Sequence, residues 1–170
     1  MCHFMRLKHC LYLCMLVFIS ACAGAGSVMN QNPLVTSLAV NANCGVMDKA
    51  ASLSVIPSID ALATQSAELA SLVKKSHGDN MDSIFEKDLV LQINMGMKST
   101  GGYRLGLTGN GSVDEDDWLV LSIEWGIPAK GAMLTQAITS PCLLLATPMQ
   151  AYKGIRVLDQ TGKTRLKASL

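Results

Sequence analysis

The chain has 170 residues, of which 49% are hydrophobic and 16% are charged. This composition fits one compact domain and excludes an intrinsically disordered protein. Fourteen Lys and Arg residues against 13 Asp and Glu leave a formal charge of +1, so the chain lacks the basic field that nucleic-acid binding needs. We therefore expect no nucleic acid among its partners.

Residues 1–21 are predicted to be a lipoprotein signal peptide. Arg6 and Lys8 make the start of this segment basic, and an apolar run follows over residues 11–19. A bilayer-spanning helix needs roughly 20 apolar residues, so this run is too short for a permanent span. The segment is therefore interpreted as a leader that directs export.

The order Ile19-Ser20-Ala21-Cys22 at the end of this leader resembles the bacterial lipobox, in which cleavage before the cysteine leaves a lipid-modified N-terminal residue. We expect Cys22 to carry the acyl anchor, which would make the lipid bilayer a partner. Ala23 resembles an outer-membrane sorting residue. The expected location is the bacterial cell envelope, on the outer membrane and facing the periplasm. The alternative is an ordinary signal peptide cleaved after Ala23 or Ala25.

Cleavage before Cys22 would leave 149 of the 170 residues, with 12 basic and 13 acidic side chains. Cleavage would also remove the three cysteines of the leader, and acylation would use the thiol of Cys22. Cys44 and Cys142 are therefore the thiols that can pair. The periplasm is oxidising, and a bridge across so long a loop would be strongly stabilising. We predict a disulfide between Cys44 and Cys142. Two buried free thiols are the alternative.

Residues 22–33 are small and polar and are predicted to be a flexible tether, so that a single domain occupies residues 34–170. Strands are predicted over residues 34–40 and 52–56, with Cys44 in the loop between them. One amphipathic helix is predicted over residues 60–75, where leucines recur at helical spacing. Ser58 is its expected N-cap, and the turn residues 76–80 are expected to end it.

From residue 88 onward, apolar side chains recur at every second position, which predicts β-strands. The predicted strands cover residues 88–95, 103–107, 118–125, 134–139, 142–146, 155–158 and 164–167. Trp118 and Trp125 must face opposite sides of one strand, and Trp125 has the parity of the core. The predicted fold class is mainly β (α+β), an antiparallel sheet or sandwich with one helix.

The segment Lys98-Ser99-Thr100-Gly101-Gly102-Tyr103 connects two predicted strands, and its glycines permit a close backbone approach. Together with the Pro128–Gly131 turn and the Thr139-Ser140-Pro141 corner, this segment resembles the PrcB-like protease-complex-subunit family over about residues 88–148. Ser99 departs from the family pattern, which has Pro before the Thr-Gly-Gly-Tyr turn.

The resemblance implies a non-catalytic lipoprotein that binds another protein and stabilises a secreted or periplasmic protease complex. The partner-binding residues would then be Lys98, Ser99, Thr100, Gly101, Gly102 and Tyr103. The same loop is also similar to the inhibitory loop of chagasin-like protease inhibitors, which is the alternative function. Leu105 stands where that pattern has an aromatic residue, and its Arg-Pro-Trp-like triplet does not occur.

The residues after the leader include one histidine, His77, which lies among turn residues beside Ser76 and Asp79. A solvated loop histidine explains this position better than a catalytic triad does. The sequence contains no zinc motif, phosphate-binding loop or dinucleotide fingerprint. We therefore expect no catalytic residue, no metal and no cofactor.

Five basic residues crowd the C-terminal strands, namely Lys153, Arg156, Lys163, Arg165 and Lys167. They could attract anionic lipid headgroups, or they could be charged edge residues that deter aggregation. The second interpretation is favoured.

Overall fold

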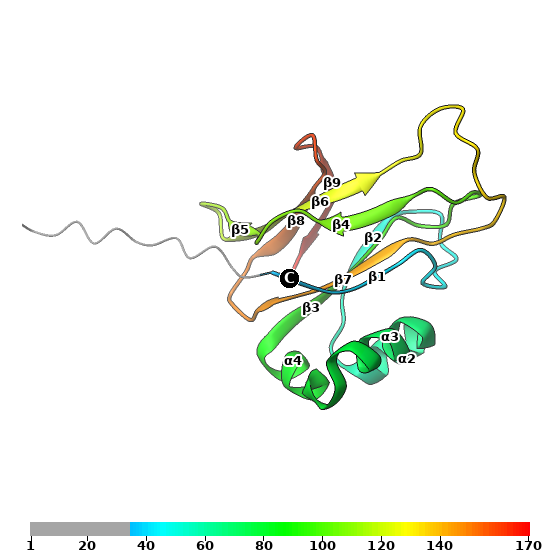
Figure 1. Ribbon diagram of the computed structural model, residues 1–170. Coiled ribbons are helices and arrows are strands. Elements are labelled where there is room, and N and C mark those ends of the chain that lie inside the picture. Colours follow the sequence, from blue (N-terminus) through cyan, green and yellow to red (C-terminus); the bar gives the residue numbers. More distant parts are fainter. Residues whose placement is uncertain (1–34) are drawn as a thin grey trace, which may run out of the picture. The chain divides into compact units, whose positions relative to one another are not determined.

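The computed structural model describes residues 35–170 (Figure 1). The predicted signal peptide, the anchor residue Cys22 and the tether lie outside these residues. Within residues 35–170, no helix has both the length and the apolar character that crossing a bilayer requires.

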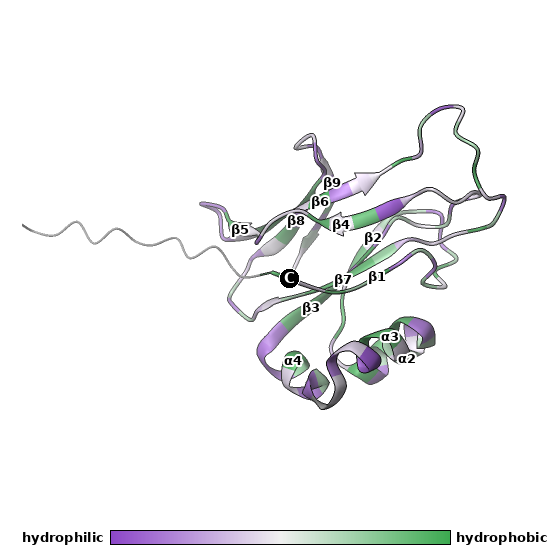
Figure 2. Ribbon diagram, in the orientation of Figure 1, coloured by the Kyte–Doolittle hydropathy of each residue, from purple (hydrophilic) through white to green (hydrophobic). Residues whose placement is uncertain are grey.

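The first sheet has four antiparallel strands, in the order β1 (Thr36–Asn41), β7 (Cys142–Pro148), β3 (Asp88–Asn94) and β2 (Ser52–Val55). Its two central strands are buried, and Leu91 of β3 lies opposite Leu145 of β7. Figure 2 shows β7 as mostly hydrophobic. Leu143 and Leu145 of β7 face one side of the sheet and Leu144 faces the other, and all three are buried, so the continuous apolar run of β7 is that of a strand covered on both faces.

The second sheet consists of β4 (Arg104–Leu107), β6 (Trp118–Gly126), β8 (Gly154–Leu158) and β9 (Thr164–Ser169), with the short β5 (Ser112–Val113) also paired to β6. Strands β6 and β8 run parallel, whereas the other pairs are antiparallel. The predicted mainly β fold class is confirmed.

A hydrophobic core fills the space between the two sheets. Alternate residues of β6 point into it, including Leu119 and Trp125, and they meet side chains such as Ile93 from the first sheet. Trp118 lies on the outer face of β6, where Lys167 and Arg156 cover its ring. The predicted division of the two tryptophans between opposite faces is confirmed.

Helices cover the other face of the first sheet, with a second hydrophobic core beneath them (Figure 1). They are α2 (Ile59–Gln65), α3 (Ala67–His77) and α4 (Met81–Lys87), with a 3-10 turn over Gly78–Asn80. Ser58 caps α2 as predicted, because its hydroxyl accepts a hydrogen bond from the Ala61 amide.

The helical layer differs from the single predicted helix in two ways. Ser66 has an extended backbone and caps α3, so the predicted helix is divided into α2 and α3. The third helix, α4, was not predicted. Its apolar residues Met81, Ile84 and Phe85 have helical spacing, but seven residues between a turn and a strand give too short a pattern.

The prediction of a strand over residues 134–139 is wrong. These residues belong to a long loop between β6 and β7, and of the six only Thr139 forms an isolated β-bridge, to Lys98. The side chains of residues 134–139 do follow the pattern that predicted a strand. The backbone groups of this segment, however, form hydrogen bonds to a glycine-rich loop and not to a strand.

The strand directions gather three long loops at one end of the domain, where the β8–β9 turn also lies. Residues 42–51, 95–103 and 127–141 all lie at this end, which we call the loop end (Figure 1). The described chain begins and finishes at the opposite end, where the Val35 amide bonds the Asn110 carbonyl and the Leu170 amide bonds the Lys153 carbonyl.

Candidate functional site

The candidate partner-binding residues 98–103 lie in the loop that follows β3, residues 95–103. Gly96 near the start of this loop has a φ of +75°. A β-carbon here would lie 2.6 Å from the carbonyl oxygen of Ala50 and even closer to that of Lys49. The next residue, Met97, donates its amide proton to the Asp48 carbonyl at 2.7 Å. Glycine is therefore required where the loop passes against residues 42–51.

The same loop is tied to the long loop, residues 127–141. Lys98 and Thr139 exchange backbone hydrogen bonds of 2.8 and 3.0 Å, and the Thr139 hydroxyl donates to the Thr100 carbonyl. The Gly101 amide donates to the Thr135 carbonyl at 2.9 Å. Hydrogen bonds thus hold the two loops together along most of residues 98–101.

Gly102 shows why the Gly-Gly pair is present. Its φ is +86°, and a β-carbon on it would lie 2.8 Å from the Leu134 side chain and 3.2 Å from that of Pro128. The close backbone approach predicted from the glycines is therefore used within the protein, to seat the long loop.

The side chains of this loop divide into packed and accessible ones. Tyr103 is half-buried and packs against the core between the sheets, with the Lys98 ammonium 5.6 Å from its ring centroid. Ser99 and Gly102 are exposed. Ser99, beside the half-buried Lys98, is thus the side chain that this loop offers most freely to a partner.

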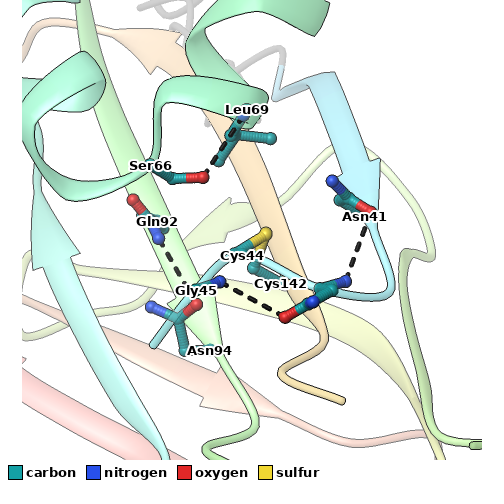
Figure 3. The surroundings of a disulfide bond; sticks show 9 residues. Asn41, Cys44, Gly45, Ser66, Leu69, Gln92, Asn94 and Cys142 are labelled. Carbon is teal, nitrogen blue, oxygen red and sulfur yellow. Dashed lines mark hydrogen bonds between the residues drawn. A yellow bond between two sulfur atoms is a disulfide. The ribbon is translucent and has the colours of Figure 1, made fainter. Parts of the chain in front are cut away.

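Cys44 and Cys142 form a disulfide (Figure 3), which confirms the predicted pairing. Their Cα atoms are 6.0 Å apart, and both residues are completely buried. The Cys44 amide also donates to the Ser140 carbonyl at 2.9 Å. The disulfide and this hydrogen bond fix residues 42–51 to the end of the long loop and the start of β7.

Buried polar side chains lie near the disulfide on the helix-facing side of the first sheet (Figure 3). Gln92 donates from Nε2 to Asn94 Oδ1 at 3.3 Å, and both residues are buried. Three buried atoms have no hydrogen-bond partner among the described residues: Asn41 Nδ2, Gln92 Oε1 and Ser140 Oγ. Sequence reasoning missed this cluster, because polar residues alternating with leucines are typical of a solvated face.

Most of the C-terminal basic residues are neutralised by nearby carboxylates. Arg156 lies 3.2 Å from Asp114, and Arg165 lies 2.7 Å from Asp159. Lys153 lies 3.0 Å from Asp117, and this hydrogen bond and the Asp117 charge raise the pKa of Lys153. The Lys167 ammonium lies 4.3 Å from the Trp118 ring centroid. These contacts favour a structural role over attraction to lipid headgroups.

His77 ends α3, and its Nδ1 lies 2.8 Å from the Ser76 hydroxyl and 3.3 Å from the Val73 carbonyl oxygen. Both contacts are local to the helix end. Among residues 35–170, no three His, Cys, Asp or Glu residues are grouped as a metal site would require.

The fold thus defines a class of protein, a two-sheet domain with a helical cover and a disulfide-fixed group of loops at one end. Residues 89–148 match the family model described as PrcB C-terminal, so this part of the chain is similar to the PrcB-like family. The match runs from β3 through β7 and includes both the candidate loop and the long loop. No curated protein sequence and no solved structure matches the chain.

Proposed function

We propose that this protein is a non-catalytic subunit that binds and stabilises a secreted or periplasmic protease, and that residues 98–103 contact the protease. The observation that carries the proposal is the position of the family match, which covers residues 89–148 and with them two of the three loops at the loop end. Loops held on a rigid two-sheet scaffold are the usual place for binding residues.

Site-specific photo-crosslinking in the native envelope tests this contact. A photoreactive amino acid replaces Ser99, which is exposed on the candidate loop, and in the control it replaces Ser71, which is exposed on α3. We expect position 99 to give an adduct that mass spectrometry identifies as a protease, and position 71 to give none. A protease adduct from both positions, or from neither, would refute the assignment to this loop.

The fate of the protease separates a stabilising subunit from a chagasin-like inhibitor. Deleting the protein should shorten the lifetime of a stabilised protease and lower its activity in the envelope. If deletion instead raises the activity while the amount of protease is unchanged, the protein is an inhibitor.

We also propose that the protein is anchored in the outer membrane, facing the periplasm, through an acyl group on Cys22. Metabolic labelling with an alkynyl palmitate should mark the wild-type chain. The variant Cys22→Ser should lose the label, and Cys14→Ser, which changes a cysteine of the predicted leader, should keep it. Persistent labelling of Cys22→Ser would show that the anchor is elsewhere.

A further inference from the structure

The long loop, residues 127–141, holds apolar side chains in water. Met133 is 101% exposed, Ile138 is 66% exposed and Ile127 is 57% exposed. The Ala132 amide bonds the Ala129 carbonyl, and Gly131 has a φ of +83°, so a tight turn directly precedes Met133. Exposed apolar side chains gathered on one surface mark an interaction site far more often than scattered ones do.

The loop end carries a further such residue, because Met47 on the neighbouring loop is 80% exposed. The other exposed large hydrophobics of the described residues lie on separate elements: Val40, Val55, Leu72, Met149 and Leu170. Apolar exposure is therefore concentrated at the loop end and scattered over the rest of the domain.

These side chains project from a backbone that is already fixed. Hydrogen bonds at Thr135 and Thr139 tie the long loop to residues 98–101, and the Ser140 amide bonds the Ala42 carbonyl at 3.1 Å. The disulfide of Cys142 holds its C-terminal end. Because the loop is ordered beforehand, a partner would bind it without the entropic cost of ordering it.

The charge of the three loops is positive on balance. Residues 127–141 contain Lys130 and residues 95–103 contain Lys98, with no acidic residue in either range, whereas residues 42–51 contain both Asp48 and Lys49. Lys130 is exposed and Lys98 is half-buried. A partner surface that is apolar and flanked by carboxylates would complement both the hydrophobic and the charged groups.

We propose that the loop end is a docking surface for a protein partner that presents apolar side chains flanked by Asp or Glu, with Met133 and Ile138 as its main apolar contacts. This inference rests on the proposed function and names the chemistry of the partner. A second copy of the chain fits poorly, since it would bring lysines against lysines. A bilayer is also disfavoured, because none of the exposed large hydrophobics of the described residues is aromatic.

A display library of random peptides, selected on the purified full chain, tests this partner chemistry. We expect the enriched peptides to combine apolar residues with Asp or Glu. Met133→Asp and Ile138→Asp should each weaken binding of the best peptide about tenfold or more, as removal of a central contact does. Met149→Asp, which changes an exposed methionine at the opposite end of the domain, should leave the affinity unchanged.

The lysines supply a separate readout. In the double variant Lys98→Gln and Lys130→Gln, binding of acidic peptides should weaken and should lose most of its dependence on salt concentration. Urea unfolding of every variant checks that the fold is retained.

Several outcomes would overturn the inference. Enriched peptides without acidic residues, no enrichment at all, or equal binding by wild type and Met133→Asp would each do so. Binding to phosphatidylglycerol vesicles that Met133→Asp abolishes would reassign the surface to the membrane, and a dimer that Met133→Asp dissociates would reassign it to a second copy. If acidic peptides bind the loop end but the crosslinked protein is no protease, the surface stands and the proposed function fails.

Discussion

Gly96 has no β-carbon, and this absence allows residues 95–103 to pass directly against residues 42–51. Gly96→Ala would combine a positive φ with a clash against the carbonyl oxygens of Lys49 and Ala50. Gly131 has a similar φ of +83° but open space around its Cα, so Gly131→Ala isolates the cost of the conformation alone.

We expect Gly131→Ala to lower the free energy of unfolding by about 1 kcal/mol, and Gly96→Ala to lower it by at least about 2 kcal/mol more. Urea unfolding monitored by tryptophan fluorescence measures both values. Equal losses in the two variants would mean that the contact between the loops is not tight.

Asp159 is the described carboxylate with the most strongly altered acidity. It is buried at the β8–β9 turn, where the Thr161 hydroxyl donates to it at 2.6 Å, the Thr161 and Lys163 amides donate to it, and Arg165 pairs with it. The Thr161 hydrogen bond is the largest cause that holds the pKa of Asp159 well below its ordinary value of 3.8, and it outweighs the opposing effect of burial.

Because the pKa of Asp159 is lower in the folded state than in the unfolded chain, its stabilising effect is complete above pH 3.8 and is lost as the pH falls below that value. Thr161→Val should raise this pKa toward 3.8 and make the protein unfold at a higher pH during acidification. Carbon-13 NMR titration of the side-chain carboxyl measures the shift. An unchanged titration in Thr161→Val would show that the hydroxyl does not hold the carboxylate.

At the scale of elements, one serine decides where a helix begins. The Ser66 hydroxyl accepts from the Leu69 amide at 3.3 Å, and Ser66 separates α2 from α3. Ser66→Ala should lower the free energy of unfolding by about 1 kcal/mol through loss of the N-cap. Ser71→Ala, in the exposed interior of α3, should leave stability the same or raise it slightly. Circular dichroism during thermal unfolding compares the two, and similar melting temperatures would argue against the cap.

The strands were the most predictable elements, since a strand packed against a core repeats its apolar residues every second position. Residues 118–125 show this pattern, and β6 follows it closely. The pattern failed over residues 134–139, because periodicity records side chains and says nothing of where backbone hydrogen bonds go. It also failed to reveal that Gln92 is buried beneath the helices, since polar residues in a strand are normally solvated.

The candidate site was predictable in part. The glycines of residues 98–103 correctly indicated a close backbone approach, but the neighbour that they approach is 26 or more residues further along the chain. The exposure of the Met133 side chain follows from this long-range packing, so it cannot be predicted from the residues next to it in the sequence. The disulfide could be predicted because only two cysteines remained once the leader and Cys22 were set aside.

For the molecule as a whole, the Cys44–Cys142 disulfide is the main covalent constraint within the described residues, and it spans a sequence separation of 98 residues. In the chain-entropy model, closing a loop of this length stabilises the folded state by about 4–5 kcal/mol. The double variant Cys44→Ala and Cys142→Ala should therefore be less stable by about that amount and should keep its β-sheet circular dichroism. Urea unfolding measures the loss of stability. An unchanged free energy of unfolding in the double variant would mean that packing alone, without the disulfide, stabilises the fold.

Both ends of the described chain, Val35 and Leu170, emerge at the end of the domain opposite the three loops. If the chain is anchored through Cys22 and binds its partner with the loop end, as we propose, attachment and recognition would not compete for space. A tether joined before Val35 would then set how far the loops can reach and hence the effective concentration of the domain near a partner, while the intrinsic affinity would stay a property of the loops. Changing the length of that tether should alter how often the two proteins meet without altering how long they stay together.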